Sequence, residues 1–140
     1  AAAGLLGFGT GLTPSGDDLV GASLFARRIL GRWNERWQAV AEELAQLVER
    51  RSHRLSASLF RDLVRGQSFA PLHDLAVALV LREDERALHA ARQLVSIGHS
   101  SGWDMLTGFI LGAGGFNTAL PTDPSNMTGG HARAQAQILN

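Results

Sequence analysis

The sequence contains no cysteine and no lysine, and each absence narrows the chemistry open to the protein. Without cysteine, the chain can form no disulfide, no thiolate metal site and no thiol nucleophile. Without lysine, every basic contact to a ligand must come from arginine or histidine, and the arginine guanidinium suits carboxylates and phosphates. Lack of cysteine is also typical of a reducing compartment, so we expect a cytoplasmic protein.

The sequence also lacks a surplus of charge and any long apolar run. Its 13 basic and 13 acidic residues give a formal net charge of zero. Non-specific binding to nucleic acid needs a basic surplus, so we expect no nucleic-acid partner. No apolar run approaches the roughly 18 residues of a membrane-spanning helix, so we expect no membrane partner either. A chain of 140 residues, 45% of them apolar, is long enough to form one domain with its own core.

Apolar residues recur with a helical period through most of the chain, and no segment alternates with period two. The stripes comprise Trp33, Trp37, Val40, Leu44 and Val48; Leu55, Leu59 and Leu63; Leu72, Leu75 and Leu79; Leu88, Ala91 and Val95; and Met105, Phe109 and Ile110. Gly66 and Gly98 end helices, and Pro71 suits a helix start. The pattern predicts an all-α fold, a compact bundle of about six helices. The two tryptophans belong either to the core or to an interface.

The character of the sequence changes from Gly112 onward. The stretch "GAGGFNTALPTDPSNMTGG" is rich in glycine and proline and has little periodicity. We therefore expect a helical domain over residues 1–116 and a Gly/Pro-rich C-terminal tail over residues 117–140, either flexible or held by a partner.

Two polar motifs stand at predicted helix starts. The first, "GFGTGLTPSGDDLVG", covers residues 7–21, and the second, "HSSGWDMLTG", covers residues 99–108. Both contain Ser-Gly-x-Asp followed by apolar residues and a glycine. Such an echo indicates one local geometry used twice.

One interpretation of the echo is helix capping. A serine with an acid three residues later is close to a capping box, in which Ser15 or Ser101 caps the helix and Asp18 or Asp104 reaches back. Each cap contributes about 1 kcal/mol. On this interpretation the chain is a non-catalytic helical interaction module.

The other interpretation is a ligand site. Glycines allow close approach of a ligand, and a glycine loop before a helix exposes backbone amides to an anion. The acids repel an anion, so they bind a bridging cation such as Mg²⁺ or Mn²⁺, accept hydrogen bonds from a neutral substrate group, or face away. A shared site would join both motifs. The catalytic candidates are Asp17, Asp18, His99 and Asp104, and a metal, if any, would lie on Asp17, Asp18 and Asp104. The ligand-binding candidates are Gly9, Gly11, Thr13, Ser15, Gly16, Ser100, Ser101 and Gly102.

The two motifs, in this order, resemble the signatures of a bacterial domain-of-unknown-function family that includes the AllH subunit of oxamate carbamoyltransferase. The linking stretch "HRLSASLFRDLVRGQSFAPLHDLAVAL" is similar too, at Ser56, Leu59 and Gly66. The resemblance covers about residues 4–112 and implies the C-terminal part of a longer family chain.

This resemblance implies a role in allantoin and purine breakdown. The implied reaction transfers a carbamoyl group between oxalurate, or a related ureido acid, and phosphate, and gives carbamoyl phosphate. The implied partners are other subunits of a multi-subunit enzyme and a small anionic substrate such as carbamoyl phosphate or oxamate. An anion cradle, donors to the carbamoyl oxygen and an acceptor for the amide protons are what this chemistry needs.

Overall fold

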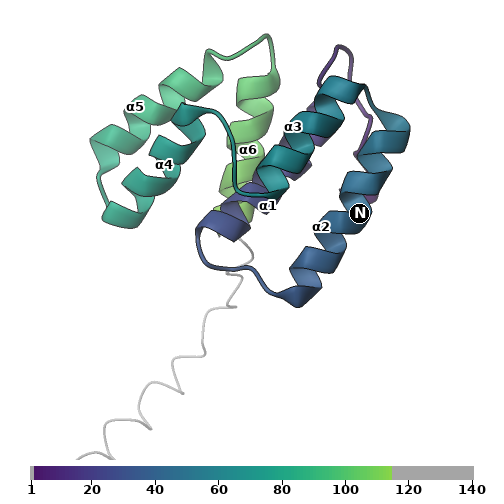
Figure 1. Ribbon diagram of the computed structural model, residues 1–140. Coiled ribbons are helices and arrows are strands. Elements are labelled where there is room, and N and C mark those ends of the chain that lie inside the picture. Colours follow the sequence, from purple (N-terminus) through teal and green to yellow (C-terminus); the bar gives the residue numbers. More distant parts are fainter. Residues whose placement is uncertain (1, 115–140) are drawn as a thin grey trace, which may run out of the picture.

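The computed structural model describes residues 2–114, and this range is helical without any strand (Figure 1). A short 3₁₀ turn, η1 (Ala2–Gly4), precedes the glycine loop. The helices are α1 (Ser15–Ile29), α2 (Glu35–Arg51), α3 (Arg54–Val64), α4 (Ala70–Leu81), α5 (Asp84–Val95) and α6 (Ser101–Gly114). The predicted all-α bundle of six helices is thus confirmed. The expected tail, residues 117–140, lies outside the described residues.

Helices α1 and α6 pack against each other in the middle of the molecule. The α2–α3 hairpin lies on one side of this pair and the α4–α5 hairpin on the other (Figure 1). Glycines explain the close packing of the central pair. A Cβ atom added at Gly108 would overlap the backbone oxygen of Leu19, and one at Gly112 would overlap that of Ser23. Since only glycine leaves this space empty, these two residues set the distance between α1 and α6.

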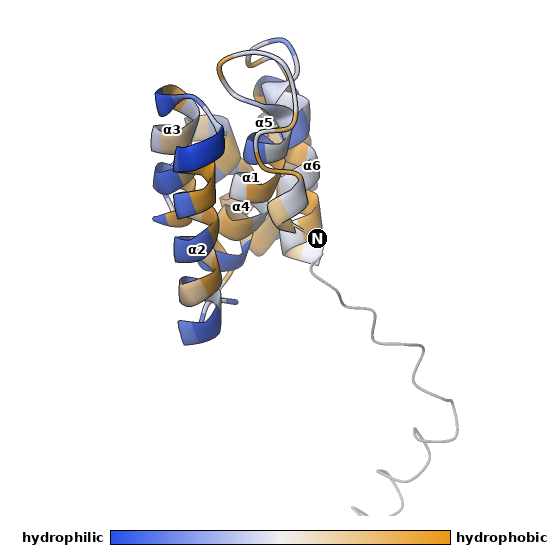
Figure 2. Ribbon diagram, turned by 90° about the vertical axis from the view of Figure 1, so that its right-hand side faces the viewer, coloured by the Kyte–Doolittle hydropathy of each residue, from blue (hydrophilic) through white to orange (hydrophobic). Residues whose placement is uncertain are grey.

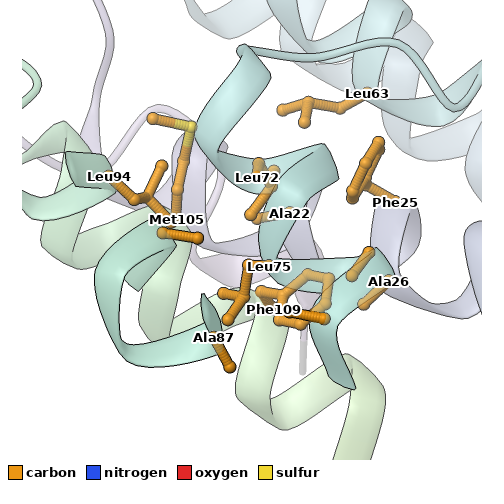
Figure 3. Packing of buried hydrophobic residues seen from close by; sticks show 13 residues of the cluster. Ala22, Phe25, Ala26, Leu63, Leu72, Leu75, Ala87, Leu94, Met105 and Phe109 are labelled. Atoms are coloured by element: carbon orange, nitrogen blue, oxygen red, sulfur yellow. The ribbon is translucent and has the colours of Figure 1, made fainter. Parts of the chain in front are cut away.

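Two hydrophobic clusters share α1. The first joins α1 to α4, α5 and α6 around Phe25, Leu72 and Phe109 (Figure 3). The second joins α1 to α2 and α3, and it includes Leu6 from the loop before α1. Figure 2 shows hydrophilic residues along the outer helix α2 and hydrophobic residues in the centre of the molecule. Helix α1 is therefore supported on both sides, which holds its first turn in place.

Trp33 and Trp37 lie at the edge of the second cluster and are half-buried. The guanidinium of Arg27 lies 4.0 Å from the ring centre of Trp37, and that of Arg28 lies 5.0 Å from the ring centre of Trp33. Such cation–π contacts cover the outer faces of aromatic side chains. The two tryptophans therefore belong to the border of the core. Among the described helices, none has both the length and the apolarity to cross a membrane.

Candidate functional site

The two Ser-Gly-x-Asp motifs meet in the structure. The hydroxyl oxygens of Thr13, just before α1, and Ser101, the first residue of α6, are 2.9 Å apart and hydrogen bonded. These residues are 88 positions apart in the chain. The first turns of α1 and α6 therefore lie side by side, as the shared-site hypothesis requires.

The glycine of each motif has a packing role. A Cβ atom on Gly16 would overlap the backbone oxygen of Leu5, and one on Gly102 would overlap that of Leu94. Each helix start is thus pressed against the carbonyl of a preceding segment. This close approach explains the repeated glycine without a ligand, so a ligand-binding role for either glycine stays a prediction.

The helix-cap interpretation is wrong for α1. The residue before the helix is Pro14, which has no side chain able to cap, and Ser15 already lies inside the first turn. The backbone N–H groups of Asp17 and Asp18 both donate to the carbonyl of Pro14. The Ser101 hydroxyl, in turn, is hydrogen bonded to Thr13. Ser15 is therefore not the cap that its spacing to Asp18 suggested, and a capping role for the second motif stays a prediction.

Asp17 is a buried structural acid. It is 2% exposed, and its two oxygens accept hydrogen bonds from the backbone N–H of Gly7 at 2.9 Å and from the Ser56 hydroxyl at 2.6 Å. It therefore ties the glycine loop and helix α3 to the start of α1. Because both carboxylate oxygens already accept hydrogen bonds, the contacts of Asp17 give no support to its predicted catalytic role.

Asp18 is different, because one of its oxygens has no partner. The residue is 5% exposed, and Oδ2 is buried without a hydrogen bond in the described part of the chain. The pKa of Asp18 is raised from 3.8 to about 6, mainly by burial and to a smaller extent by the nearby Asp104 and Asp17. Hydrogen bonds from the hydroxyls of Ser101 and Thr13 act in the opposite direction. A buried acceptor that lacks a donor is costly in a folded protein and is typical of a functional site.

Asp18 lines a cavity of about 240 Å³ between α1, α3, α6 and the α3–α4 connection. Its other lining residues are Leu59, Asp62, Leu63, Gln67, Ser68, Phe69 and Met105. The hydroxyl oxygen of Ser68 is buried and also lacks a hydrogen-bond partner within the described residues. The cavity therefore offers hydrogen-bond acceptors on apolar walls, and none of the described residues that line it is an arginine or a histidine.

The sequence pattern did not indicate the wall formed by Asp62, Gln67, Ser68 and Phe69. The sequence marks Gly66 as a helix end and as a position of the family resemblance, and this glycine has a positive φ of 81°. The sequence feature that could have indicated this wall is the polar pair Gln67-Ser68 in a short connection between two apolar helices. Polar residues at such a place are common in loops, so the pattern alone does not distinguish them from solvent-facing ones.

The remaining candidates of the second motif lie at or near the same helix start. Asp104 is half-buried, with a buried Oδ2 that has no partner. His99 and Ser100 are exposed in the turn before α6, and no side-chain hydrogen bond joins either of them to Asp18 or Asp104 among residues 2–114. Their roles stay predictions.

The described residues contain no group of three acids or histidines able to hold a metal ion, so the proposed cation on Asp17, Asp18 and Asp104 is without support.

The residues described thus define a class of protein: an all-helical domain in which two matching helix starts meet beside an acid-lined cavity. A family model described as oxamate carbamoyltransferase subunit AllH matches residues 5–113, and the chain belongs to this family. No curated protein and no solved structure shows significant similarity to the chain. The family match agrees with the resemblance carried by the two motifs, both of which lie within the matched range.

Proposed function

We propose that the chain acts as an AllH-type subunit of a multi-subunit oxamate carbamoyltransferase, and that the Asp18 cavity binds the carbamoyl group of its substrate. Family membership supports the first part. One observation carries the second part: the buried Oδ2 of Asp18, a residue that lines the cavity, accepts no hydrogen bond from the described part of the chain. The proposal assigns the missing donor to the substrate.

The chemistry of a carbamoyl group matches the cavity. Its NH₂ carries two donors, and the cavity presents two unpartnered acceptors, the oxygens of Asp18 and Ser68. Hydrogen bonds to an ionised carboxylate are about twice as strong as those between neutral groups. With a pKa of about 6, Asp18 is mostly ionised at pH 7. A cavity of about 240 Å³ holds a group of this size.

The same cavity disfavours the anionic part of a substrate. Asp18 and Asp62 both line it and would repel a phosphate or a carboxylate. The predicted binding of a small anion is therefore divided in this proposal: the carbamoyl end lies against Asp18, and the charged end lies outside the cavity. This division accounts for the acids that follow a glycine loop whose composition alone predicted an anion site.

Titration of the protein with oxamate tests the proposal. The amide resonances of the residues around Asp18 should shift and saturate, as followed by two-dimensional nuclear magnetic resonance. Asp18→Asn should weaken binding at least about tenfold, because a hydrogen bond to a charged group contributes roughly 1.5–3 kcal/mol. Asp74→Asn is the matched control, since Asp74 lies on α4 and has only a 4.0 Å ion pair with Arg86. Equal oxamate affinity of the wild type and Asp18→Asn would contradict the proposal.

A second candidate function is the non-catalytic interaction module, and one surface favours it. An apolar groove of about 510 Å³ runs between α4, α5 and α6, and its lining side chains Leu88 and Ile110 are 53% and 58% exposed. Exposed apolar surface of this kind marks contacts with other proteins. On this candidate, another subunit of the enzyme covers the groove, and Ile110→Glu should abolish co-purification with that subunit while leaving oxamate binding intact.

A further inference from the structure

A second cavity, of about 290 Å³, lies between the glycine loop and the corner that joins α2 to α3. One wall is the loop, with Gly7, Gly9, Gly11 and Pro14. The opposite wall is the sequence Arg50-Arg51-Ser52-His53. In contrast to the Asp18 cavity, its lining within residues 2–114 contains no acid.

The loop wall is rich in backbone N–H groups. Gly7, Gly9 and Gly11 have positive φ angles of 77°, 129° and 104°. A Cβ atom on Gly11 would have no atom within 4 Å, so packing does not require glycine there and the backbone angle does. The backbone N–H groups of residues 9–13 donate no hydrogen bond to the described part of the chain. Successive free amides in a turning backbone form concavities that bind anions.

The facing wall supplies positive charge and a hydroxyl. Arg50 is exposed and has no ion-pair partner within residues 2–114, and Arg51 donates to the carbonyl of Ala3 at 2.7 Å. The hydroxyl oxygen of Ser52 is buried and has no hydrogen-bond partner among residues 2–114. Both arginines lie in the last turn of α2, and His53 is the residue before α3.

Glu49, next to Arg50 in the chain, and Asp17, which is bonded to Gly7, both have partners in the described part of the chain. Glu49 is paired with Arg61, with a nitrogen–oxygen distance of 2.6 Å. Asp17 accepts hydrogen bonds from Gly7 and Ser56 with its two oxygens. Ser52 also lines a neighbouring cavity, but that cavity contains the Glu49–Arg61 pair. The glycine-loop cavity thus has two lining arginines, Arg50 and Arg51, and no acid among the described residues around it.

We propose that this second cavity is an oxyanion site that binds a phosphate or a carboxylate group. Amides of the loop, the guanidinium of Arg50, the Ser52 hydroxyl and the His53 imidazole act as its donors. Arginine beside backbone amides is a common arrangement for such groups. The proposal goes beyond the carbamoyl site, because it uses a different cavity and gives Asp18 no part.

Titrations with inorganic phosphate and with oxalate test the site in the full chain. We expect saturable shifts of the amide resonances of residues 7–13 and 50–53. Arg50→Gln should weaken binding at least fivefold. Arg92→Gln is the matched control, because Arg92 is an exposed arginine of α5 without an ion-pair partner in the described part of the chain. Ser52→Ala should also weaken binding while leaving the midpoint of thermal unfolding nearly unchanged.

The two titrations separate the ligand classes. Saturation with phosphate alone assigns a phosphate site, saturation with oxalate alone assigns a carboxylate site, and saturation with both assigns a general oxyanion site. Absence of saturation with either ion, or equal losses for Arg50→Gln and Arg92→Gln, would overturn the proposal. Asp18→Asn should leave phosphate binding unchanged, so failure of the oxyanion site and failure of the carbamoyl site give different results.

Discussion

Replacing Asp18 with asparagine should stabilise the protein at neutral pH. Burial raises the pKa of Asp18 from 3.8 to about 6, so the folded state holds the proton more tightly than the unfolded state. The contribution of Asp18 to stability is then greatest below about pH 4, falls as the pH rises from about 4 to 6, and is level above that range. A shift of one pKa unit corresponds to about 1.4 kcal/mol, so ionised Asp18 lowers the free energy of unfolding by about 3 kcal/mol at pH 7.

The asparagine side chain has the size of a protonated aspartic acid and carries no charge. Asp18→Asn should therefore raise the free energy of unfolding by roughly 1–3 kcal/mol at pH 7 and leave it nearly unchanged at pH 4. A helix cap predicts the opposite sign, a loss of about 1 kcal/mol. If Asp18 binds the carbamoyl group as proposed, the variant should at the same time lose oxamate binding, a trade between stability and function.

Urea unfolding followed by circular dichroism between pH 4 and pH 8 measures this difference. Asp17→Asn is the internal control, because Asp17 accepts two hydrogen bonds and its amide would turn a donor toward one of them. It should destabilise by about 1–3 kcal/mol at pH 7. Destabilisation by Asp18→Asn at pH 7, or an effect of equal size at pH 4 and pH 7, would refute the argument from burial.

The remaining predictions concern the framework that holds the site. Ser56→Ala should cost about 1–3 kcal/mol, because it removes the donor to buried Asp17; an unchanged urea midpoint would show that this bond is not needed. Gly108→Ala and Gly112→Ala should each cost at least about 2 kcal/mol, because the added methyl overlaps the backbone of α1. Gly114→Ala is their control, since nothing lies within 4 Å of its Cβ position, and thermal unfolding midpoints that do not separate these variants would contradict the packing of α1 on α6.

Local pattern was sufficient to predict the helices. The stripes ending at Gly66 and Gly98 match α3 and α5, because an apolar residue every three or four positions is visible within one segment. The repeated Ser-Gly-x-Asp predicted one local geometry at two helix starts. Their contact through Thr13 and Ser101 supports that interpretation of the echo.

Long-range contacts are what local pattern did not reveal. Nothing in the sequence pairs Asp17 with Ser56, 39 residues away, so two adjacent acids looked equivalent although one is structural. The capping hypothesis failed at α1 because the helix begins directly after Pro14, which places Ser15 inside the first turn. The sequence does not predict the wall of the cavity that contains Ser68, because its position depends on how the α3–α4 connection packs against α1 and α6.

The most direct test of the carbamoyl site is the pH dependence of binding for methyl carbamate, an uncharged carbamoyl compound that the oxyanion site has no charge to attract. Because protonated Asp18 is a weaker acceptor, we expect the affinity of the wild type to fall as the pH drops through about 6. Asp18→Asn should bind weakly at every pH from 4 to 8. An affinity that does not change across pH 6, or the same pH profile in both proteins, would contradict a carbamoyl group bound to Asp18.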